Sequence, residues 1–471
     1  MPASTAARRA IPALLLAVSL TACGLGPSGG AMPEHAIPLP PQFSEPGSGE
    51  AGYDLRTYWQ ALDDPVLTEL VGEALANNLD LAQSASRLAQ ARENIIQARS
   101  SLFPQLSASG NVTRDVGDGA TSHLGVSLGL DASWEADLFG RIGNSVSAAR
   151  FDYRSAGYSL ADLQRAIVGQ VAEQVINARS TQQQLQIARD TLKIQDDNLQ
   201  IAQWRLQAGL VSSLDVEQAR TQRASTAASI PLLESSLAAT SNAISTLIGE
   251  PPGRVLTLLS QPAAIPQPPA LGTLEAPAEL LRRRPDIRAA ENTLRADLAR
   301  IGAARAEQFP LLQLTGNIGT NNLGPANLFD IIAGSVIGSI TQLIFDGGRT
   351  PSRIRQAQDV ANGALAAWRE SILGALEDVE TAIAARRSAE ARLVELQEAA
   401  DAANNAAILA RSQYQAGLTD FQTLLTSENS LLAARDAVVA AEADRASAFV
   451  QLTQALGGGW SMQDFDDGKT P

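Results

Sequence analysis

The sequence is poor in the residues on which metal sites and disulfides depend. Its 471 residues include one cysteine and two histidines, and aromatic residues make up 4%. One cysteine excludes an internal disulfide, and two histidines leave little material for a metal centre. Acidic residues outnumber basic ones, 50 to 36, for a net charge of -14, so there is no basic field to attract nucleic acid. We therefore expect no metal site and no nucleic-acid partner.

Enzyme motifs and membrane-spanning apolar helices are also absent from the sequence. It contains no glycine-rich phosphate loop before a helix, no HExxH and no GxSxG pattern. Carboxylates are plentiful, but they recur at the spacing of a solvated helix surface. No apolar run of about 18 residues follows the N-terminal segment. We therefore expect no catalytic residues and no enzymatic activity.

The N-terminal segment has the features of an export signal. Arg8 and Arg9 form a basic region, and residues 11–20 form an apolar region too short to cross a bilayer. Small residues then precede Cys23, the only cysteine. This pattern resembles a bacterial lipobox and predicts a lipoprotein signal peptide over residues 1–22. A covalent lipid on Cys23 is then the only attached group we expect, with no other cofactor; a plain signal peptide with an incidental cysteine is the alternative.

One stretch of the sequence occurs twice. Residues 88–111 and 294–317 both pass from a helical pattern rich in Ala and Arg, through Phe-Pro, into an alternating pattern. Proline lacks the amide donor that a helix interior needs, so each helix ends there and a strand follows. Such long-period similarity indicates a duplicated architecture. The predicted segments are a lipidated tether or strap (23–54), a first repeat (55–249), a Pro-rich linker (250–272), a second repeat (273–457) and a flexible tail (458–471).

Two strands are predicted in each repeat. In the first three strands, apolar or small residues occupy every second position and polar residues occupy the positions between them, whereas the alternation in residues 331–345 is mixed. Such alternation indicates that one face of the sheet meets an apolar medium and the other meets water. Each strand has about 10–14 residues, which suits a tilted transmembrane strand, although a soluble sandwich has the same period. The predicted strands are residues 104–114, 121–134, 310–320 and 331–345.

Two very long helices are predicted, each followed by a shorter one. The long helices have about 65 residues and a length of about 100 Å, and Gly209 and Gly417 follow them. A short helix and the helix before a strand together match one long helix in length, so we expect the shorter helices to stack end to end. By themselves, these helices also fit an elongated coiled-coil scaffold. The long helices cover residues 142–208 and 352–416, and the short ones cover residues 213–247 and 421–456.

Four strands cannot close a barrel, because two edges would face lipid with unpaired amides. We therefore expect oligomers, and three chains would supply twelve strands. The chain resembles the TolC-like outer-membrane factor family, in its lipoprotein subgroup of tripartite efflux systems. The likeness rests on the duplication, the lipobox, the two Phe-Pro junctions and residues 280–291, which resemble the subgroup's LLxRRPDIRAAE signature.

The resemblance implies a mixed α+β membrane protein, a homotrimer with a twelve-stranded β-barrel continued by a long α-helical barrel. It implies a lipid-anchored protein of the bacterial outer membrane that extends into the periplasm. The implied partners are a periplasmic membrane-fusion adaptor and an inner-membrane pump of the resistance-nodulation-division class. The expected function is a passive gated duct for small toxic compounds or drugs. A protein-secretion duct and a non-pore coiled-coil lipoprotein scaffold are the alternatives.

The resemblance also implies a gate at the periplasmic tip. In the family, an acidic residue after the first helical turn makes closing contacts with a tyrosine and an arginine around the second. Asp215 and Tyr414 match the first two positions, and we expect a hydrogen bond between them. Thr419 stands at the arginine position and Thr423 at a position where some relatives carry an inner aspartate ring, which argues against a salt-bridge gate. Alternatively, Asp215 lies in a first helical turn, favoured by the dipole, and Tyr414 is a packing residue.

The two turns resemble the adaptor-docking tip of the family. Gly209 and Gly417 suit helix C-termini, because glycine accepts a left-handed backbone. Leu210, Val211 and Leu418 follow the glycines, and we expect them to be exposed and to contact the adaptor. Local apolar capping of the helix ends is the alternative role of these three side chains.

Overall fold

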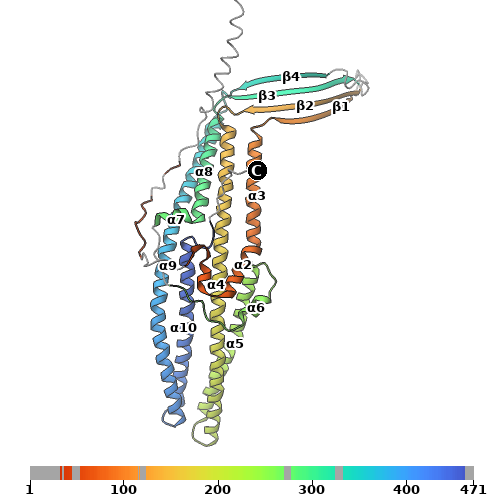
Figure 1. Cartoon of the computed structure of the whole chain (residues 1–471). Coiled ribbons are helices and arrows are strands. Elements are labelled where there is room, and N and C mark those ends of the chain that lie inside the picture. Colours follow the sequence, from red (N-terminus) through yellow and green to blue (C-terminus); the bar gives the residue numbers. More distant parts are fainter. Residues whose placement is uncertain are drawn as a thin grey trace, which may run out of the picture.

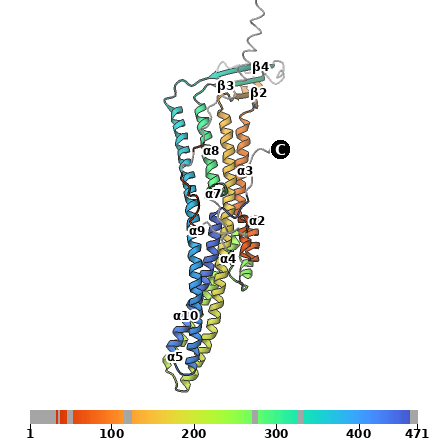
Figure 2. The same ribbon diagram turned by 60° about the vertical axis from the view of Figure 1, so that its left-hand side comes forward.

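The computed structural model describes residues 32–33, 37–44, 53–114, 116, 124–269, 277–323 and 332–461. The chain is elongated, with a sheet at one end and two helical turns at the other (Figure 1, Figure 2). Within the described residues, no helix is long and apolar enough to cross a membrane. The predicted signal peptide and the acylation site Cys23 lie outside the described residues.

The four predicted strands form one antiparallel sheet in the order β1-β2-β3-β4. Two strands come from each repeat, and the central pair β2-β3 joins the repeats. The duplicated helix-to-strand junctions thus meet in a single sheet. The strands are β1 (Gln105–Arg114), β2 (Leu124–Ala136), β3 (Leu311–Leu323) and β4 (Ile332–Thr341).

The register gives the sheet one apolar and one polar face, as the alternation predicts. Leu130 of β2 lies between Ala108 and Ile318 of the neighbouring strands, whereas the next residue, Asp131, lies beside Asn317. Because successive side chains of a strand point to opposite faces, most apolar residues share one face and most polar residues the other. Ile337, opposite Thr315 on the polar face, and Thr320, opposite Leu128 on the apolar face, are exceptions.

The inner and outer strands end differently from the prediction. β2 continues to Ala136, beyond the predicted end at 134, because it pairs with β3 as far as Leu312. β4 stops at Thr341, short of the predicted end at 345, because its pairing with β3 stops opposite Leu311. The strand ends therefore follow the partner strand rather than the residue pattern.

The two long helices and their hairpins are present as predicted. The long helices have 67 residues each, about 100 Å at 1.5 Å per residue, and the short ones that follow have 35 residues each. The first hairpin consists of α4 (Arg141–Gln207) and α5 (Ser213–Leu247), and the second of α9 (Arg349–Gln415) and α10 (Phe421–Ala455).

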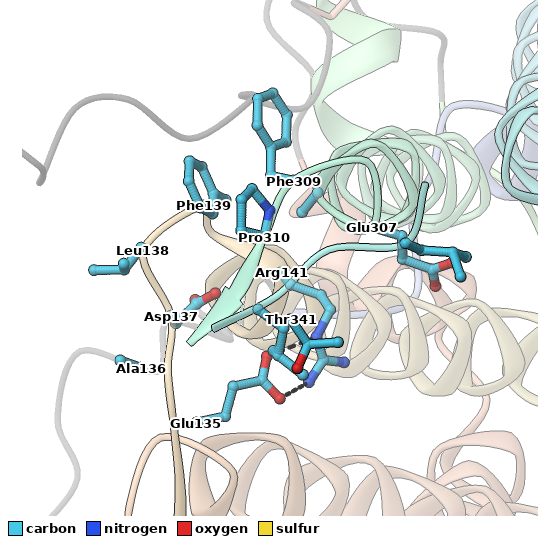
Figure 3. A pocket seen from close by; sticks show the side chains of 13 residues that line it. Glu135, Ala136, Asp137, Leu138, Phe139, Arg141, Glu307, Phe309, Pro310 and Thr341 are labelled. Atoms are coloured by element: carbon cyan, nitrogen blue, oxygen red, sulfur yellow. Dashed lines mark hydrogen bonds and ion pairs between the residues drawn. The ribbon is translucent and has the colours of Figure 1, made fainter. Parts of the chain in front are cut away.

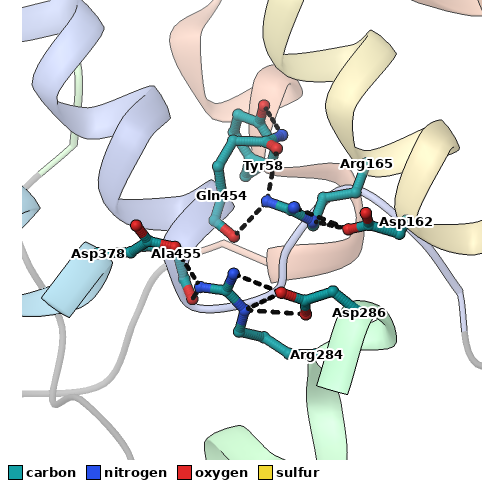
Figure 4. A network of polar contacts seen from close by, with 8 residues as sticks. All are labelled: Tyr58, Asp162, Arg165, Arg284, Asp286, Asp378, Gln454 and Ala455. Atoms are coloured by element: carbon teal, nitrogen blue, oxygen red, sulfur yellow. Dashed lines mark hydrogen bonds and ion pairs between the residues drawn. The ribbon is translucent and has the colours of Figure 1, made fainter. Parts of the chain in front are cut away.

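The short helices stack end to end, which confirms the prediction from their lengths. α3 (Leu79–Ser100) continues α5, and α8 (Pro285–Ala306) continues α10. The side-chain amide of Asn78 donates to the carbonyl of Leu247 at 2.8 Å. The guanidinium of Arg284 donates to the carbonyl of Ala455 at 3.2 Å, as Figure 4 shows. Each pair of short helices thereby lies beside a long helix over its length.

Shorter elements surround the helix junctions at the middle of the molecule (Figure 1). Tyr58, Leu67 and Leu70 are fully buried in a core shared with Val171 and Phe449 of the long and short helices. One of these elements, α6, lies inside the stretch predicted to be only a linker. They are the 3-10 helix η2 (Leu55–Leu62) and the helices α2 (Pro65–Asn77), α6 (Arg254–Leu259) and α7 (Pro277–Arg283).

Both terminal segments are partly packed on the helices. The prediction of a flexible tail from residue 458 is wrong at its start, because Trp460 is buried and meets the ring of Tyr158 edge-on at 6.4 Å. At the other end, Phe43 is buried beside Trp368. The described part of the predicted tether is therefore a strap on the helices.

Candidate functional site

The two hairpin turns lie at the end of the molecule opposite the sheet (Figure 1). Gly209 and Gly417 have φ angles of 72° and 74°, in the left-handed region that only glycine adopts without strain. The amide of Leu210 donates to the carbonyl of Arg205 at 2.8 Å, which satisfies a carbonyl at the end of α4. The turns thus have the glycine-dependent geometry that the sequence predicts.

A small apolar core joins the two hairpins just above the turns. Tyr414, only 2% exposed, packs edge-on against Phe421 with ring centroids 5.5 Å apart. Ala202 and Val216 of the first hairpin belong to the same core. Tyr414 is therefore a packing residue between the hairpins, one of the two roles considered from the sequence.

Arg205, which the sequence did not single out, contacts Tyr414 in two ways. Its guanidinium donates to the carbonyl of Tyr414 at 2.6 Å. The guanidinium carbon also lies 4.5 Å from the centroid of the Tyr414 ring, within the range of a cation–π interaction. The sequence feature that could have indicated Arg205 is a basic residue in the last turn of α4, because cations are favoured at helix C-termini.

The expected hydrogen bond between Tyr414 and Asp215 is not formed within the chain. The Asp215 carboxylate accepts from the Ser212 hydroxyl at 3.0 Å instead, in the first turn of α5. The Tyr414 hydroxyl is buried and has no hydrogen-bond partner among the described residues. Burial raises the pKa of Tyr414, which Asp215 raises further and Arg205 lowers. Within the chain, Asp215 therefore makes no direct hydrogen bond to Tyr414.

Thr419 and Thr423 lie at the start of the short helix after the second turn. The backbone amide of Thr423 donates to the Asp420 carboxylate at 2.8 Å, so Asp420 is the N-cap of α10. Thr423 is exposed and Thr419 is half-buried. Neither side chain supplies a charge to the tip.

A buried carboxylate links the hairpins above the turns. Glu428 of α10, 8% exposed, accepts from the amide of Asn198 at 2.8 and 2.7 Å and from the guanidinium of Arg411 at 2.9 Å. These three residues, which we call the Glu428 cluster, come from α4, α9 and α10. No sequence motif indicates the Glu428 cluster, because its three members lie on separate helices.

The apolar residues of the turns are solvent-facing. Leu210 is 68% exposed and Leu418 is 78% exposed, whereas Val211 is half-buried. Leucines at such exposure are not capping their own helices by apolar contact. The surface they form is suited to a protein partner.

At the opposite end of the helices, the two repeats meet below the sheet (Figure 3). The rings of Phe139 and Phe309 stack with centroids 4.8 Å apart and 14° between planes. Arg141 donates two hydrogen bonds to Glu135, of 2.9 and 2.6 Å. These residues line a pocket of about 320 Å³ between the end of β2 and the start of β3. The aromatic stack fixes the repeats to each other where strands become helices.

No group of three His, Cys, Asp or Glu side chains that could hold a metal ion occurs in the part of the chain that the structure describes. The features described above are surfaces: a polar sheet face, two long hairpins and a tip where side chains of the two hairpins meet. A strand set with one lipid-suited face, continued by hairpins about 100 Å long, defines the subunit of an outer-membrane channel.

The chain belongs to the outer membrane efflux protein family, whose model matches residues 70–250 and 276–458. The two matches fall on the two predicted repeats. The predicted family, the outer-membrane location and the efflux role are thereby confirmed.

Curated relatives and solved structures agree with the family match over nearly the whole chain. The cation efflux system protein CusC of Escherichia coli is 32% identical and is covered over 98% of its length by 95% of this chain. SilC of Salmonella typhimurium, named a probable outer membrane lipoprotein, is 32% identical over 84% of this chain and 87% of its own length. The solved outer-membrane channel OprN superposes with a TM-score of 0.83 at 32% identity, covering 93% of this chain and 100% of OprN.

Proposed function

We propose that three copies of this chain form a passive, gated duct for small toxic compounds or drugs in a tripartite efflux system. The observation that carries the proposal is the two-faced sheet. Its polar face bears Ser, Thr and Asn side chains with the carboxylates of Asp131 and Glu135, and its other face bears aliphatic side chains. In a closed barrel, the aliphatic face meets lipid and the polar face lines a water-filled bore. Transport energy comes from the pump, and the duct needs no covalent chemistry.

The two edges of the chain fit each other in a ring. β1 and the preceding α3 form one edge of the sheet and helix array, and β4 and the following α9 form the other. When the β4 edge of one protomer meets the β1 edge of the next, the contact is heterologous and closes into a ring. Exposed apolar side chains mark these edges, with Ile96, Leu102 and Leu106 on one and Ile340, Leu373 and Ile408 on the other.

The duplication specifies the register between protomers. Gln105 pairs with Ser133 in the first hairpin, and the equivalent Leu311 pairs with Thr341 in the second. Between the repeats, Ala136 pairs with Leu312. The same pairing between chains places Ile344 of one protomer opposite Leu106 of its partner.

This register accounts for the short β4. Ile344 is 88% exposed and Leu106 is 71% exposed in the single chain. Pairing with the next protomer would extend β4 to about its predicted end, because strand ends follow the partner strand. It also places both side chains on the apolar face of the barrel.

Cysteine cross-linking tests this closure. We expect the double variant Leu106→Cys/Ile344→Cys to form covalent trimers on oxidation, because opposite residues of paired strands have Cβ atoms about 4.5–5.5 Å apart. The control Val112→Cys/Ile344→Cys places the thiols six residues out of register, about 20 Å apart along the strand. Single-cysteine variants measure any background from Cys23. Efficient cross-linking of the control and not of the first pair contradicts the register.

Beyond the duct, we propose a lipid anchor and an adaptor-docking surface. Acylation of Cys23 would tether the chain to the outer membrane, and SilC, a relative, carries the name lipoprotein. The exposed Leu210 and Leu418, with Val211, would dock the periplasmic adaptor that joins the tip to the inner-membrane pump. We propose Asp215, Tyr414, Thr419 and Thr423 as the residues that surround the gate at the same tip.

Single-channel conductance of the purified protein tests the duct, with particle mass measured on the same sample. We expect a particle of three chains that is mostly closed and opens briefly to a discrete conductance. Three-chain particles that conduct in no variant with a loosened tip would contradict the duct and favour the scaffold alternative.

A further inference from the structure

The ends of α4 and α9 are joined by one cationic side chain. In the lower half of the molecule α10 packs against both α4 and α9, and Arg205 reaches from the last turn of α4 to the last turn of α9. It donates to the Tyr414 carbonyl at 2.6 Å and its guanidinium carbon lies 4.5 Å from the centroid of the Tyr414 ring. A guanidinium nitrogen of Arg205 also lies 3.6 Å from the point where a Cβ would stand on Gly417. The guanidinium of Arg205 therefore lies near the start of the second turn.

The position of Arg205 suits two helix ends at once. The last carbonyls of a helix lack intrahelical partners and carry the negative end of its dipole. The Arg205 side chain bridges the ends of α4 and α9, and residues 412–415 at the end of α9 are uncharged. The equivalent of Arg205 in the second repeat is Gln413, so a single guanidinium serves both C-termini. Its planar group donates a hydrogen bond and lies over the ring in one fixed geometry, whereas an ammonium is a compact point charge that cannot stack on a ring.

The other links between the hairpins differ from this one. The Glu428 cluster contains Asn198, about 10 Å further up α4, and its carboxylate is buried. Gln218 and Gln422 form a neutral hydrogen bond of 3.3 Å between α5 and α10. Arg205 is half-buried, so water can replace its contacts at lower cost than at the buried carboxylate. The lower link is therefore the one that can open while the upper one holds.

We propose that Arg205 is the latch of the tip: its contact with Tyr414 holds the end of α9 against α4, and its release lets the second hairpin move while the Glu428 cluster stays closed. This proposal rests on the proposed duct function. In this proposal the positive charge at the tip comes from the first hairpin, and it contacts Tyr414 of the second hairpin. Thr419 occupies the position in the second hairpin where the family carries an arginine. The Tyr414 hydroxyl is not part of the latch, since the carbonyl and the ring make the contacts.

Two readouts test the latch in the full-length trimer. Spin labels at Gln207→Cys and Gln415→Cys report the distance between the two turns without any need for conduction, and planar bilayers report opening. The variants are Arg205→Ala and Arg205→Lys. The control is Arg220→Ala, which removes an exposed α5 arginine that pairs with Glu217 of the same helix at 3.0 Å. Particle mass and melting temperature show whether each variant assembles.

We expect Arg205→Ala to lengthen and broaden the distance distribution and to raise the open probability by about tenfold or more, because a charge-assisted hydrogen bond and a ring contact are lost. Arg205→Lys should lie between Arg205→Ala and the wild type, and it carries the test if Arg205→Ala fails to assemble. Distances and open probability that match the Arg220→Ala control would overturn the latch. A changed distance without conductance in any variant would leave the latch standing and refute the duct.

Discussion

Asn78 and Arg284 occupy equivalent positions of the two repeats, and both donate a hydrogen bond to a carbonyl at the end of the short helix below them. Asn78 reaches Leu247 at 2.8 Å and Arg284 reaches Ala455 at 3.2 Å. The carboxamide oxygen of Asn78 also accepts hydrogen bonds from two backbone amides at the start of α3. Arg284 instead forms an ion pair with Asp286 at the start of α8. The signature-like run 280–291 therefore joins two stacked helices.

Arg284→Ala should weaken the second junction more than any exposed arginine nearby. Burial raises the pKa of the Asp286 carboxyl, but its pairing with Arg284 outweighs this and leaves the pKa below its usual value. Arg284 also pairs with Asp378 of α9 at 2.8 Å. We expect a loss of about 2 kcal/mol per chain, the usual range for a hydrogen-bonded charged group, seen as a lower melting temperature of the trimer. The control Arg282→Ala removes an exposed side chain, and an equal effect there would contradict this role.

Glu428→Gln should destabilise the upper link between the hairpins. The neutral amide loses the ion pair with Arg411 and presents a donor to Asn198, which already donates. We expect a loss of about 1 kcal/mol per chain, since Arg411 is partly solvated. Faster hydrogen exchange in α10 around Glu428 is the readout. Glu217→Gln, on the exposed surface of α5, is the control, and equal exchange in the two variants would count against the buried link.

Glu173 should make stability depend on pH. Burial raises the pKa of its carboxyl, and hydrogen bonds from Ser447 and Gln451 offset this only in part. Above this raised pKa, the buried charge of Glu173 therefore lowers the free energy of unfolding. The penalty vanishes below the ordinary glutamate pKa, where folded and unfolded chains are both protonated.

We accordingly expect Glu173→Gln to raise the melting temperature at neutral pH and to leave it unchanged in acid. The control Glu377→Gln alters an exposed carboxylate, and Glu173 and Glu377 line one surface pocket between α4 and α9. A gain for Glu173→Gln that persists unchanged at low pH would show that its charge is not the cause.

Tyr414→Ala should open the tip more than Tyr414→Phe. Phenylalanine keeps the ring beside Arg205 and the packing on Phe421, and the lost hydroxyl has no partner among the described residues. Alanine removes the ring, and removing a buried aromatic costs about 3–5 kcal/mol. Open probability in planar bilayers is the measurement. Equal opening in both variants would mean that the hydroxyl, and a contact to Asp215 in the assembly, controls the tip.

The architecture was predictable because it depends on local pattern. The alternation around Leu130 and Asp131 gave the two faces of the sheet, and Gly209 and Gly417 gave the hairpin turns. The predictions that were wrong concern tertiary contacts between distant parts of the chain. Trp460 is one aromatic in a polar tail, and its burial depends on a surface formed by distant helices.

The location of the tip was predictable from the sequence, but the side-chain contacts within it were not. Family likeness pointed to Asp215 and Tyr414, yet the chain pairs Asp215 with Ser212. The position of Arg205 in a last helical turn was too common a feature to single it out, because its partner Tyr414 lies in the other repeat. A contact between repeats requires knowledge of which helix ends lie side by side.

The central claim is that the polar face of the sheet lines an aqueous bore. The most direct test compares two single-cysteine variants at adjacent positions of β2. The measurement is the reaction of each cysteine with a charged, water-soluble thiol reagent in lipid bilayers. Ser127 lies on the polar face opposite Asn111, and Leu128 lies on the apolar face opposite Gly110. If the polar face lines an aqueous bore, Ser127→Cys reacts and its open-channel conductance falls, while Leu128→Cys does not react. Reaction of Leu128→Cys with Ser127→Cys protected would contradict the duct.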